Sequence, residues 1–240
     1  MRIKATLEYD GSLFKGFQSQ KNTKNTAAQH LQNALSSLEI KDKIIASGRT
    51  DANVHASNQV VHFDIPDFWS DIGKLQHEIN RKLIGIRIKK VEIANDDFHA
   101  RYSAKKRRYR YLFQTKKPDV FHERYVSFYE NVDVKLLQEA LSCFVGEHDF
   151  HNYSKSGSQP KSTTREIYKA IAYRYKGYYI ITIEANGFLR SQVRMLCADA
   201  LAYAQKKIAL SDIKDKLTTS HSISSKPACA NGLYLSKVFY

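Results

Sequence analysis

The sequence predicts an α+β fold made of two halves with the same order of elements. Short runs in which apolar and polar residues alternate indicate half-buried strands, and longer runs with apolar residues three or four positions apart indicate helices. Both kinds of run occur in the order strand, helix, strand, strand, helix, strand, once in each half of the chain. With 240 residues and 42% hydrophobic content, the chain is long enough for one large domain or for two small ones.

The first half opens with an expected strand over residues 2–9, where apolar and polar residues alternate. A helix is expected to follow Thr26, because Thr26 and Gln29 have the spacing of a capping box. The other expected elements of this half are strands over residues 43–46, 59–63 and 86–93, and a helix over residues 70–83 that stops before Gly85.

The second half repeats this order, with one short additional helix at residues 211–217. Its expected elements are strands over residues 108–114, 167–175, 178–184 and 233–239, and helices over residues 134–145 and 189–205. We therefore expect two βαββαβ halves, residues 1–104 and 105–240, each a split βαβ unit of the ferredoxin-like or RRM-like kind. Their antiparallel sheets are expected to join across a central cleft, with the helices on the outer face.

One segment interrupts the alternation of strands and helices. Residues 152–164 are rich in Ser, Gly, Pro and Thr, and they contain Lys155 and Lys161 but no acidic residue. The segment is interpreted either as an exposed connector between strands or as a basic arm that contacts a phosphate backbone, because loops serve both purposes.

The charge of the chain indicates a polyanionic partner. Lys and Arg number 38 against 24 Asp and Glu, a formal net charge of +14. The excess is concentrated in residues 101–117, where eight basic residues are interleaved with Tyr102, Tyr109, Tyr111 and Phe113 and no acid occurs. Cations that bind phosphates and rings that stack on unpaired bases suit RNA better than a membrane. The alternative is an ordinary solvated basic face.

No stretch of the chain has the roughly 18 to 20 uninterrupted apolar residues of a membrane span. Glu8 and Asp10 are unfavourable in a secretory signal, so a soluble, cytoplasmic protein is expected. The three cysteines are far apart and form no C-x-x-C pair, which indicates buried thiols rather than a metal or redox site.

The segment GRTDANVHA, residues 48–56, is the strongest candidate for chemistry. It lies between two expected strands and places Arg49 and Thr50 next to Asp51. These neighbours favour an ionised carboxylate held in one rotamer, which can act as a nucleophile or a base. Taken alone, an Asp in a turn is more commonly a backbone cap.

GRTDANVHA resembles the GRTDAGVHA signature of the tRNA pseudouridine synthase A family, the TruA-type enzymes. Further patterns of that family occur in the same order along nearly the whole chain. They are Tyr9-Asp10-Gly11 with Phe14, Gly16 and Gln18; Phe98-His99-Ala100-Arg101 with Ser103-Ala104; Arg108-Tyr109-Arg110-Tyr111; Gly146 with His148-Asp149-Phe150; Asn186 with Phe188-Leu189 and Val193-Arg194; and Gly232-Leu233 with Leu235, Val238 and Tyr240.

The sequence departs from the family pattern at a few positions. Asn53 replaces a Gly, and Asn is the next best residue for a left-handed backbone conformation. Phe17 replaces a Trp, Gln192 replaces a Met, and Cys197-Ala198 replace Val-Gly. None of these changes falls on the Asp, Tyr or Arg to which the family pattern assigns the chemistry.

The resemblance implies an isomerase, a pseudouridine synthase that acts on tRNA positions 38, 39 and 40 in the anticodon stem-loop. By motif, Asp51 is the catalytic aspartate that detaches uracil from ribose and lets it rejoin through carbon. Tyr109 stacks on the target base, Arg194 pairs with Asp51, and Arg49 fills the place of the flipped nucleotide. Whether Asp51 attacks the base at C6 or the sugar at C1′ stays open.

The resemblance also implies a homodimer that binds tRNA and needs neither a cofactor nor a metal. The residues expected to bind RNA are the basic side chains of the signature turn, of the basic run, of the 152–164 segment and of the helix before Arg194. They are Arg49, Arg101, Lys105, Lys106, Arg107, Arg108, Arg110, Lys155, Lys161 and Arg190.

Each assignment has an alternative. Tyr109 alternates with other aromatic residues and fits a strand core, and Arg190 and Arg194 fit simple phosphate contacts. At the level of function, the alternatives are a non-catalytic RNA-binding protein and a metal-dependent phosphohydrolase built on His148 and Asp149. The histidines are scattered, which favours structural roles over metal ligation.

Overall fold

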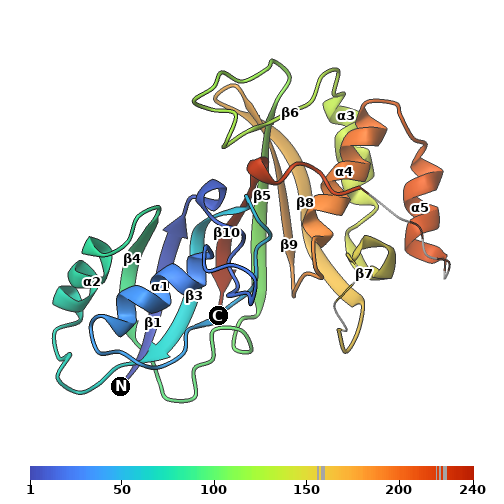
Figure 1. The fold of residues 1–240 in the computed structure, drawn as a ribbon. Coiled ribbons are helices and arrows are strands. Elements are labelled where there is room, and N and C mark those ends of the chain that lie inside the picture. The colour runs from blue at the N-terminus through green and yellow to red at the C-terminus, as the bar shows by residue number, and fades with distance from the viewer. Residues whose placement is uncertain (156, 158–159, 220, 222, 224–225) are drawn as a thin grey trace. The chain divides into compact units, whose positions relative to one another are not determined.

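The computed structural model describes residues 1–155, 157, 160–219, 221, 223 and 226–240, which form an α+β fold (Figure 1). Contacts between residues divide the chain into two compact units. The first unit comprises Met1–Lys105 and Tyr234–Tyr240, and the second comprises Lys106–Leu233. Each unit has its own strands, helices and buried core. Within the described residues, no helix is both long enough and apolar enough to cross a lipid bilayer.

The first unit contains a mixed sheet with the strand order β4, β1, β3, β10, and β2 pairs with β3. β1 pairs antiparallel with both β3 and β4, whereas β10 runs parallel to β3. The strands are β1 (Arg2–Tyr9), β2 (Ile45–Ala46), β3 (His55–Asp64), β4 (Ile86–Ile93) and β10 (Leu233–Phe239).

Two helices, α1 (Ala27–Ser36) and α2 (Ile72–Arg81), lie over this sheet (Figure 1). Every second side chain of β1 is buried, as expected for a strand with one face in the core. The Thr26 side chain caps α1 by accepting the Gln29 backbone N–H at 3.3 Å. The Gln29 side chain donates to Asn33 at 2.9 Å, so only the Thr26 half of the expected capping box is seen.

The second unit contains a sheet with the strand order β5, β9, β8, β7, in which neighbours are antiparallel, and β6 pairs parallel with β5. Helix α3 contacts both α4 and β8. The elements are β5 (Lys106–Gln114), β6 (Ser127–Phe128), α3 (Val134–Ser142), β7 (Gly146–Asp149), β8 (Thr164–Tyr175), β9 (Tyr178–Ala185), α4 (Gln192–Ala204) and α5 (Leu210–Thr218).

The structure confirms the α+β class and the expected elements of the first half in their order, but the second half differs from the expectation. It contains two additional strands, β6 and β7, which are too short to show an alternating pattern. The last strand also differs, because β10 pairs with β3 and therefore groups with the first unit instead of with residues 105–233. A strand's own sequence does not state which sheet it joins.

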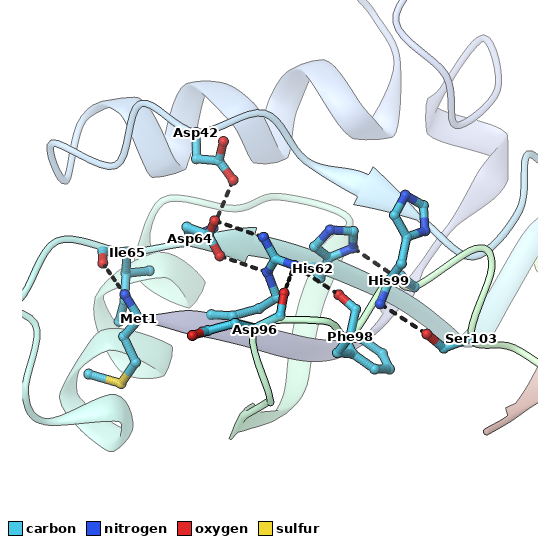
Figure 2. A network of polar contacts seen from close by, with 11 residues as sticks. Met1, Asp42, His62, Asp64, Ile65, Asp96, Phe98, His99 and Ser103 are labelled. Carbon is cyan, nitrogen blue, oxygen red and sulfur yellow. Dashed lines mark hydrogen bonds and ion pairs between the residues drawn. The ribbon is translucent and has the colours of Figure 1, made fainter.

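A network of polar contacts ties the start of β1 to β3 and to the segment that follows β4 (Figure 2). The Arg2 guanidinium donates to both carboxylate oxygens of Asp64, at 2.9 and 3.0 Å, and to the carbonyl oxygens of Asp96 and Phe98. The hydrogen bond from Arg2 is the main reason that the pKa of Asp64 is lowered. This network fixes the FHAR motif, which begins at Phe98, against the sheet of the first unit.

Candidate active-site residues

Asp51 lies half-buried in the loop of residues 47–54 that connects β2 to β3. The start of this loop is held by Gln59, a fully buried side chain of β3. Gln59 accepts the Ser47 hydroxyl at 2.7 Å through Oε1 and donates to the Gly48 carbonyl at 2.9 Å through Nε2. Ser47 N–H also donates to the Val60 carbonyl at 2.8 Å. The loop therefore leaves the sheet in a fixed direction.

Thr50, the residue before Asp51, is held through its side chain and through its backbone. Its hydroxyl is 2.8 Å from the Tyr9 hydroxyl at the end of β1, and both side chains are buried. Its carbonyl accepts the Phe17 N–H at 3.2 Å. Gly16 has a φ of +98°, and a Cβ there would lie 3.0 Å from the Thr50 carbonyl oxygen. Residues 9–17, which carry the first family pattern, thus support the residue next to Asp51.

Asn53 has a φ of +63°, in the left-handed region. This conformation was expected, because Asn is the best substitute for the Gly of the family pattern. Val54 N–H donates to the Asp51 carbonyl at 3.2 Å and closes the turn. The Asn therefore preserves the backbone conformation of the signature turn.

The end of the signature segment is fixed by His55. Gly11 N–H donates to His55 Nδ1 at 3.0 Å, and the imidazole stacks on Tyr234 with ring centroids 4.7 Å apart. Asp10 Oδ1 lies 3.3 Å from the same nitrogen. Because that nitrogen already accepts the Gly11 N–H, we interpret the Asp10 contact as close packing and not as an ion pair. His55 has a structural role, as expected.

Replacing Tyr9 with phenylalanine is expected to lower the free energy of unfolding by about 1 kcal/mol, because the buried Thr50 hydroxyl loses its partner. Chemical denaturation of the variant and the parent protein measures this difference. Tyr175→Phe serves as the control, since Tyr175 is exposed. Equal stability of the Tyr9 variant and the parent would show that the hydrogen bond contributes nothing.

Tyr109 and Arg194, the other two expected catalytic residues, belong to the second unit. Tyr109 lies in β5, is 9% exposed, and meets the Phe188 ring edge-on with centroids 5.2 Å apart. Arg194 lies in the first turn of α4, where its Nε donates to the Ala228 carbonyl at 2.8 Å. Ala228 N–H donates back to the Arg194 carbonyl at 3.0 Å. Both side chains are therefore held in defined positions within their own unit.

Gln192 has a structural role that was not predicted from the sequence. It replaces the Met of the family pattern and is fully buried at the start of α4. Its Oε1 accepts the Leu189 N–H at 2.7 Å, which closes the turn before the helix. Ser191, within this turn, has a φ of +58°. A polar side chain thus braces the turn that leads to Arg194.

The basic residues expected to bind RNA fall into two groups. Lys106 and Arg108 form ion pairs with Glu184 at 2.6 and 2.5 Å, and Arg107 donates to the Asn186 carbonyl at 2.9 Å. The others are exposed: Arg49, Arg101, Lys105, Arg110, Lys155, Lys161 and Arg190. The structure brings the backbones of Lys155 and Arg190 together through a hydrogen bond of 3.0 Å. Of the expected basic arm, residues 156, 158 and 159 lie outside the described residues.

Glu184 is a buried carboxylate between two cations. Burial alone would raise its pKa, but the hydrogen bonds from Lys106 and Arg108 outweigh burial and lower the pKa from its ordinary value of 4.5. A depressed pKa means that the ionised form stabilises the folded state above about pH 4.5 and that this stabilisation is lost as the pH falls below it.

Glu184→Gln is therefore expected to lower the free energy of unfolding by about 2 kcal/mol at pH 7. The difference from the parent should shrink as the pH is lowered toward 3, which denaturation at a series of pH values measures. Glu147→Gln is a matched control, because Glu147 is exposed and has no ion pair among the described residues. A difference that stays constant with pH would contradict the ion-pair account.

The histidines do not assemble a metal site in the part of the chain that the structure describes, where no group of three His, Cys, Asp or Glu side chains is suitably placed. His148 Nε2 lies 3.1 Å from the Val145 carbonyl, and His122 lies 2.8 Å from Asp119. The phosphohydrolase hypothesis therefore receives no support from these residues.

Comparison with known proteins identifies the family. The model of the family described as tRNA pseudouridine synthase matches residues 5–103 and 140–240 of the chain. The chain belongs to the tRNA pseudouridine synthase family. Asp51 and Arg194 lie inside the two matched segments, whereas Tyr109 lies in the stretch that separates these segments.

Relatives of this pseudouridine synthase are similar to it over their whole length. A Wolinella succinogenes protein named tRNA pseudouridine synthase A is 40% identical over 237 residues, which cover 98% of this chain and 93% of the relative. A Campylobacter jejuni protein of the same name is 37% identical over 241 residues and all of both chains. A Helicobacter pylori protein, also so named, is 37% identical over 243 residues and 99% of both chains. Membership of the family therefore holds for the chain as a whole.

Proposed function

We propose that this pseudouridine synthase isomerises uridines at positions 38, 39 and 40 in the anticodon stem-loop of tRNA, with Asp51 as the essential carboxylate. The observation that carries the proposal is the bracing of the signature loop. Thr50 is bonded to Tyr9 and Phe17, and Asn53 adopts the left-handed conformation that the signature turn requires. A loop held on both sides of one aspartate limits the rotamers and directions open to its carboxylate, which catalysis by that group needs.

The proposed reaction is redox-neutral. The bond between N1 of uracil and C1′ of ribose breaks, the base turns, and a bond forms between C5 and C1′. The C5 proton is lost and N1 gains a proton, so atoms and electrons balance without a co-reactant. Asp51 supplies the nucleophilic carboxylate, and whether it attacks C6 or C1′ leaves this balance unchanged.

We assign the supporting roles by the same motifs. Tyr109 stacks on the target base, and Arg194 pairs with the Asp51 carboxylate and orients it. Arg49 is exposed on the signature loop and occupies the place of the everted nucleotide, which offsets part of the few kcal/mol that extrusion costs. No cofactor or metal is assigned a role.

The exposed basic residues support a tRNA ligand. Arg49, Arg101, Lys105 and Arg110 are exposed cations in or close to the GRTDANVHA, FHAR and Arg108–Tyr111 motifs. We also propose RNA contacts for Lys106, Arg107 and Arg108. The first and last are positioned by Glu184, and Arg107 is positioned by the Asn186 carbonyl. Phosphate contacts of this kind make binding weaken steeply as salt is raised.

The finer arrangement is proposed from the resemblance. We assign two split βαβ halves, a homodimer in solution and a cytoplasmic location. The match to the Campylobacter jejuni relative, over all of both chains, supports one fold for the two proteins. Sedimentation of the purified chain tests the dimer separately from activity.

Tritium release tests the proposed activity. The purified protein is incubated with an unmodified tRNA transcript made with uridine labelled at C5, since that hydrogen leaves when C5 bonds to C1′. We expect release, and product at positions 38, 39 and 40 on chemical mapping. A protein that retains the tRNA on a filter but releases no tritium would instead be a non-catalytic RNA-binding protein.

A further inference from the structure

We propose that Tyr102, whose ring lies against the tilted His99 imidazole and beside Arg101, is a platform on which an unpaired base of the bound RNA stacks. The proposal deepens the proposed function, because it rests on RNA being the ligand. His99 and Arg101 belong to the FHAR motif, whereas Tyr102 occupies a position that the motif leaves open. These three side chains are called the Tyr102 platform below.

The platform stands on a rigid turn. His99 Nδ1 accepts the backbone N–H groups of Arg101 and Tyr102, both at 3.2 Å. His99 N–H donates to the Ser103 hydroxyl at 3.0 Å, and Ser103 N–H donates to the His99 carbonyl at 2.9 Å. Four hydrogen bonds within five residues hold the backbone of the turn before any ligand binds, so less conformational entropy is lost on binding.

The turn is supported from the sheet of the first unit. His62 of β3 accepts the Ala100 N–H at 3.0 Å through Nδ1, and its ring lies 4.9 Å from the His99 ring. Figure 2 shows His62 and Phe98 beside His99 and Ser103, in the same view as Asp64. Burial, and then the charges of His99 and Arg2, lower the pKa of His62. The His99 side of the platform therefore packs on β3 of the first unit.

The Tyr102 ring of the platform is open to solvent. Tyr102 is 77% exposed although it is a large ring on a rigid turn. The His99 ring lies 4.3 Å from it at an interplanar angle of 30°, and the Arg101 guanidinium carbon lies 5.8 Å from the ring centre. Most of the Tyr102 ring is thus free to make contacts, while its position is set by the imidazole.

The chemistry of the platform fits a nucleobase. Aromatic rings stack on unpaired bases of any sequence, and Arg adds a charge that attracts the neighbouring phosphate. From Arg101 to Lys117 the chain has no acidic residue, so the platform begins the most basic run of the sequence. A protein partner would be expected to meet a larger apolar patch than one ring.

Two substitutions at Tyr102 and one matched control test the proposal. We expect Tyr102→Ala to raise the Kd for a fluorescently labelled, unmodified tRNA transcript by about 10- to 100-fold, the usual effect of removing one stacking ring. Tyr102→Phe should bind like the parent, because the ring is kept. Tyr175→Ala is the control, since Tyr175 is 56% exposed and has a Lys176 ammonium 5.5 Å from its ring, but no imidazole of the described residues lies against it. We expect the control to bind within twofold of the parent.

A spectroscopic readout separates stacking from a structural effect. Anticodon stem-loops with 2-aminopurine at single loop positions lose fluorescence when that base stacks on an aromatic ring. At one position, quenching by the parent and by Tyr102→Phe should disappear with Tyr102→Ala, while the melting temperatures of all variants stay the same.

Three results would overturn the proposal. Tyr102→Ala could bind RNA as tightly as the parent, or Tyr102→Phe could lose as much affinity as Tyr102→Ala. Tyr102→Ala could also lose self-association while its RNA affinity is unchanged, which would make the platform a protein contact. Because the readout is binding and not product formation, an inactive protein whose affinity still depends on Tyr102 would remove the proposed catalytic function and leave the platform standing.

Discussion

Replacing Asp51 with asparagine is expected to slow pseudouridine formation by about a thousandfold or more, the scale seen when a catalytic nucleophile is removed. The amide has nearly the shape of the carboxylate, and the backbone bonds of Thr50 and Val54 do not involve the Asp51 side chain. The loop should therefore keep its conformation while the group that attacks is lost. Conversion of tRNA in excess enzyme measures the chemical step apart from product release.

The same variant is expected to bind tRNA with nearly parental affinity, because the exposed cations are unchanged. Asp67→Asn is a suitable control, since Asp67 is an exposed loop carboxylate and should convert tRNA at the full rate. Conversion by the Asp51 variant within tenfold of the parent would remove Asp51 from the mechanism.

Gly11→Ala is the second substitution with a large expected effect. A Cβ at residue 11 would lie 2.1 Å from the carbonyl oxygen of Val54 and 2.9 Å from the His55 nitrogen, both of them backbone atoms. Because the backbone of the signature segment must shift, we expect a loss of about 3 kcal/mol in the free energy of unfolding. That corresponds to a melting temperature lower by about 6 to 12 °C.

Gly48→Ala provides a matched control within the signature turn. A Cβ at residue 48 would meet nothing within 4 Å, so this variant should melt with the parent. Calorimetry of both variants makes the comparison. If Gly11→Ala melted with the parent as well, the close approach of the two loops would not exist in solution.

Local pattern predicted much of the first unit. The alternation of β1 and the apolar spacing of α2 are properties of consecutive residues, and both elements were found close to their expected bounds. The left-handed conformation of Asn53 was also predicted, because only a few residue types adopt it. β6 and β7 were missed because two and four residues are too few to show a period.

The supports of the candidate site could not be predicted, because they join residues far apart in the chain. The Tyr9 hydroxyl meets the hydroxyl of Thr50, 41 positions away. Arg108 donates to Glu184, 76 positions away. Lys106 and Arg108 are thus held by a carboxylate that cannot be predicted from the sequence of the basic run. The parallel pairing of β10 with β3 is of the same kind. Sequence motifs select the candidate residues, and contacts between distant parts of the chain hold them in place.

We propose that one guanidinium, Arg194, pairs with the Asp51 carboxylate beside an everted uracil. The most direct measurement is the separation of these two groups in a crystal structure of the enzyme bound to an unmodified anticodon stem-loop. We expect a guanidinium nitrogen and a carboxylate oxygen within about 4 Å of each other, the limit for an ion pair, with the target base next to them. An Arg194 guanidinium on the far side of the base, at more than about twice that distance, would contradict the proposed pairing.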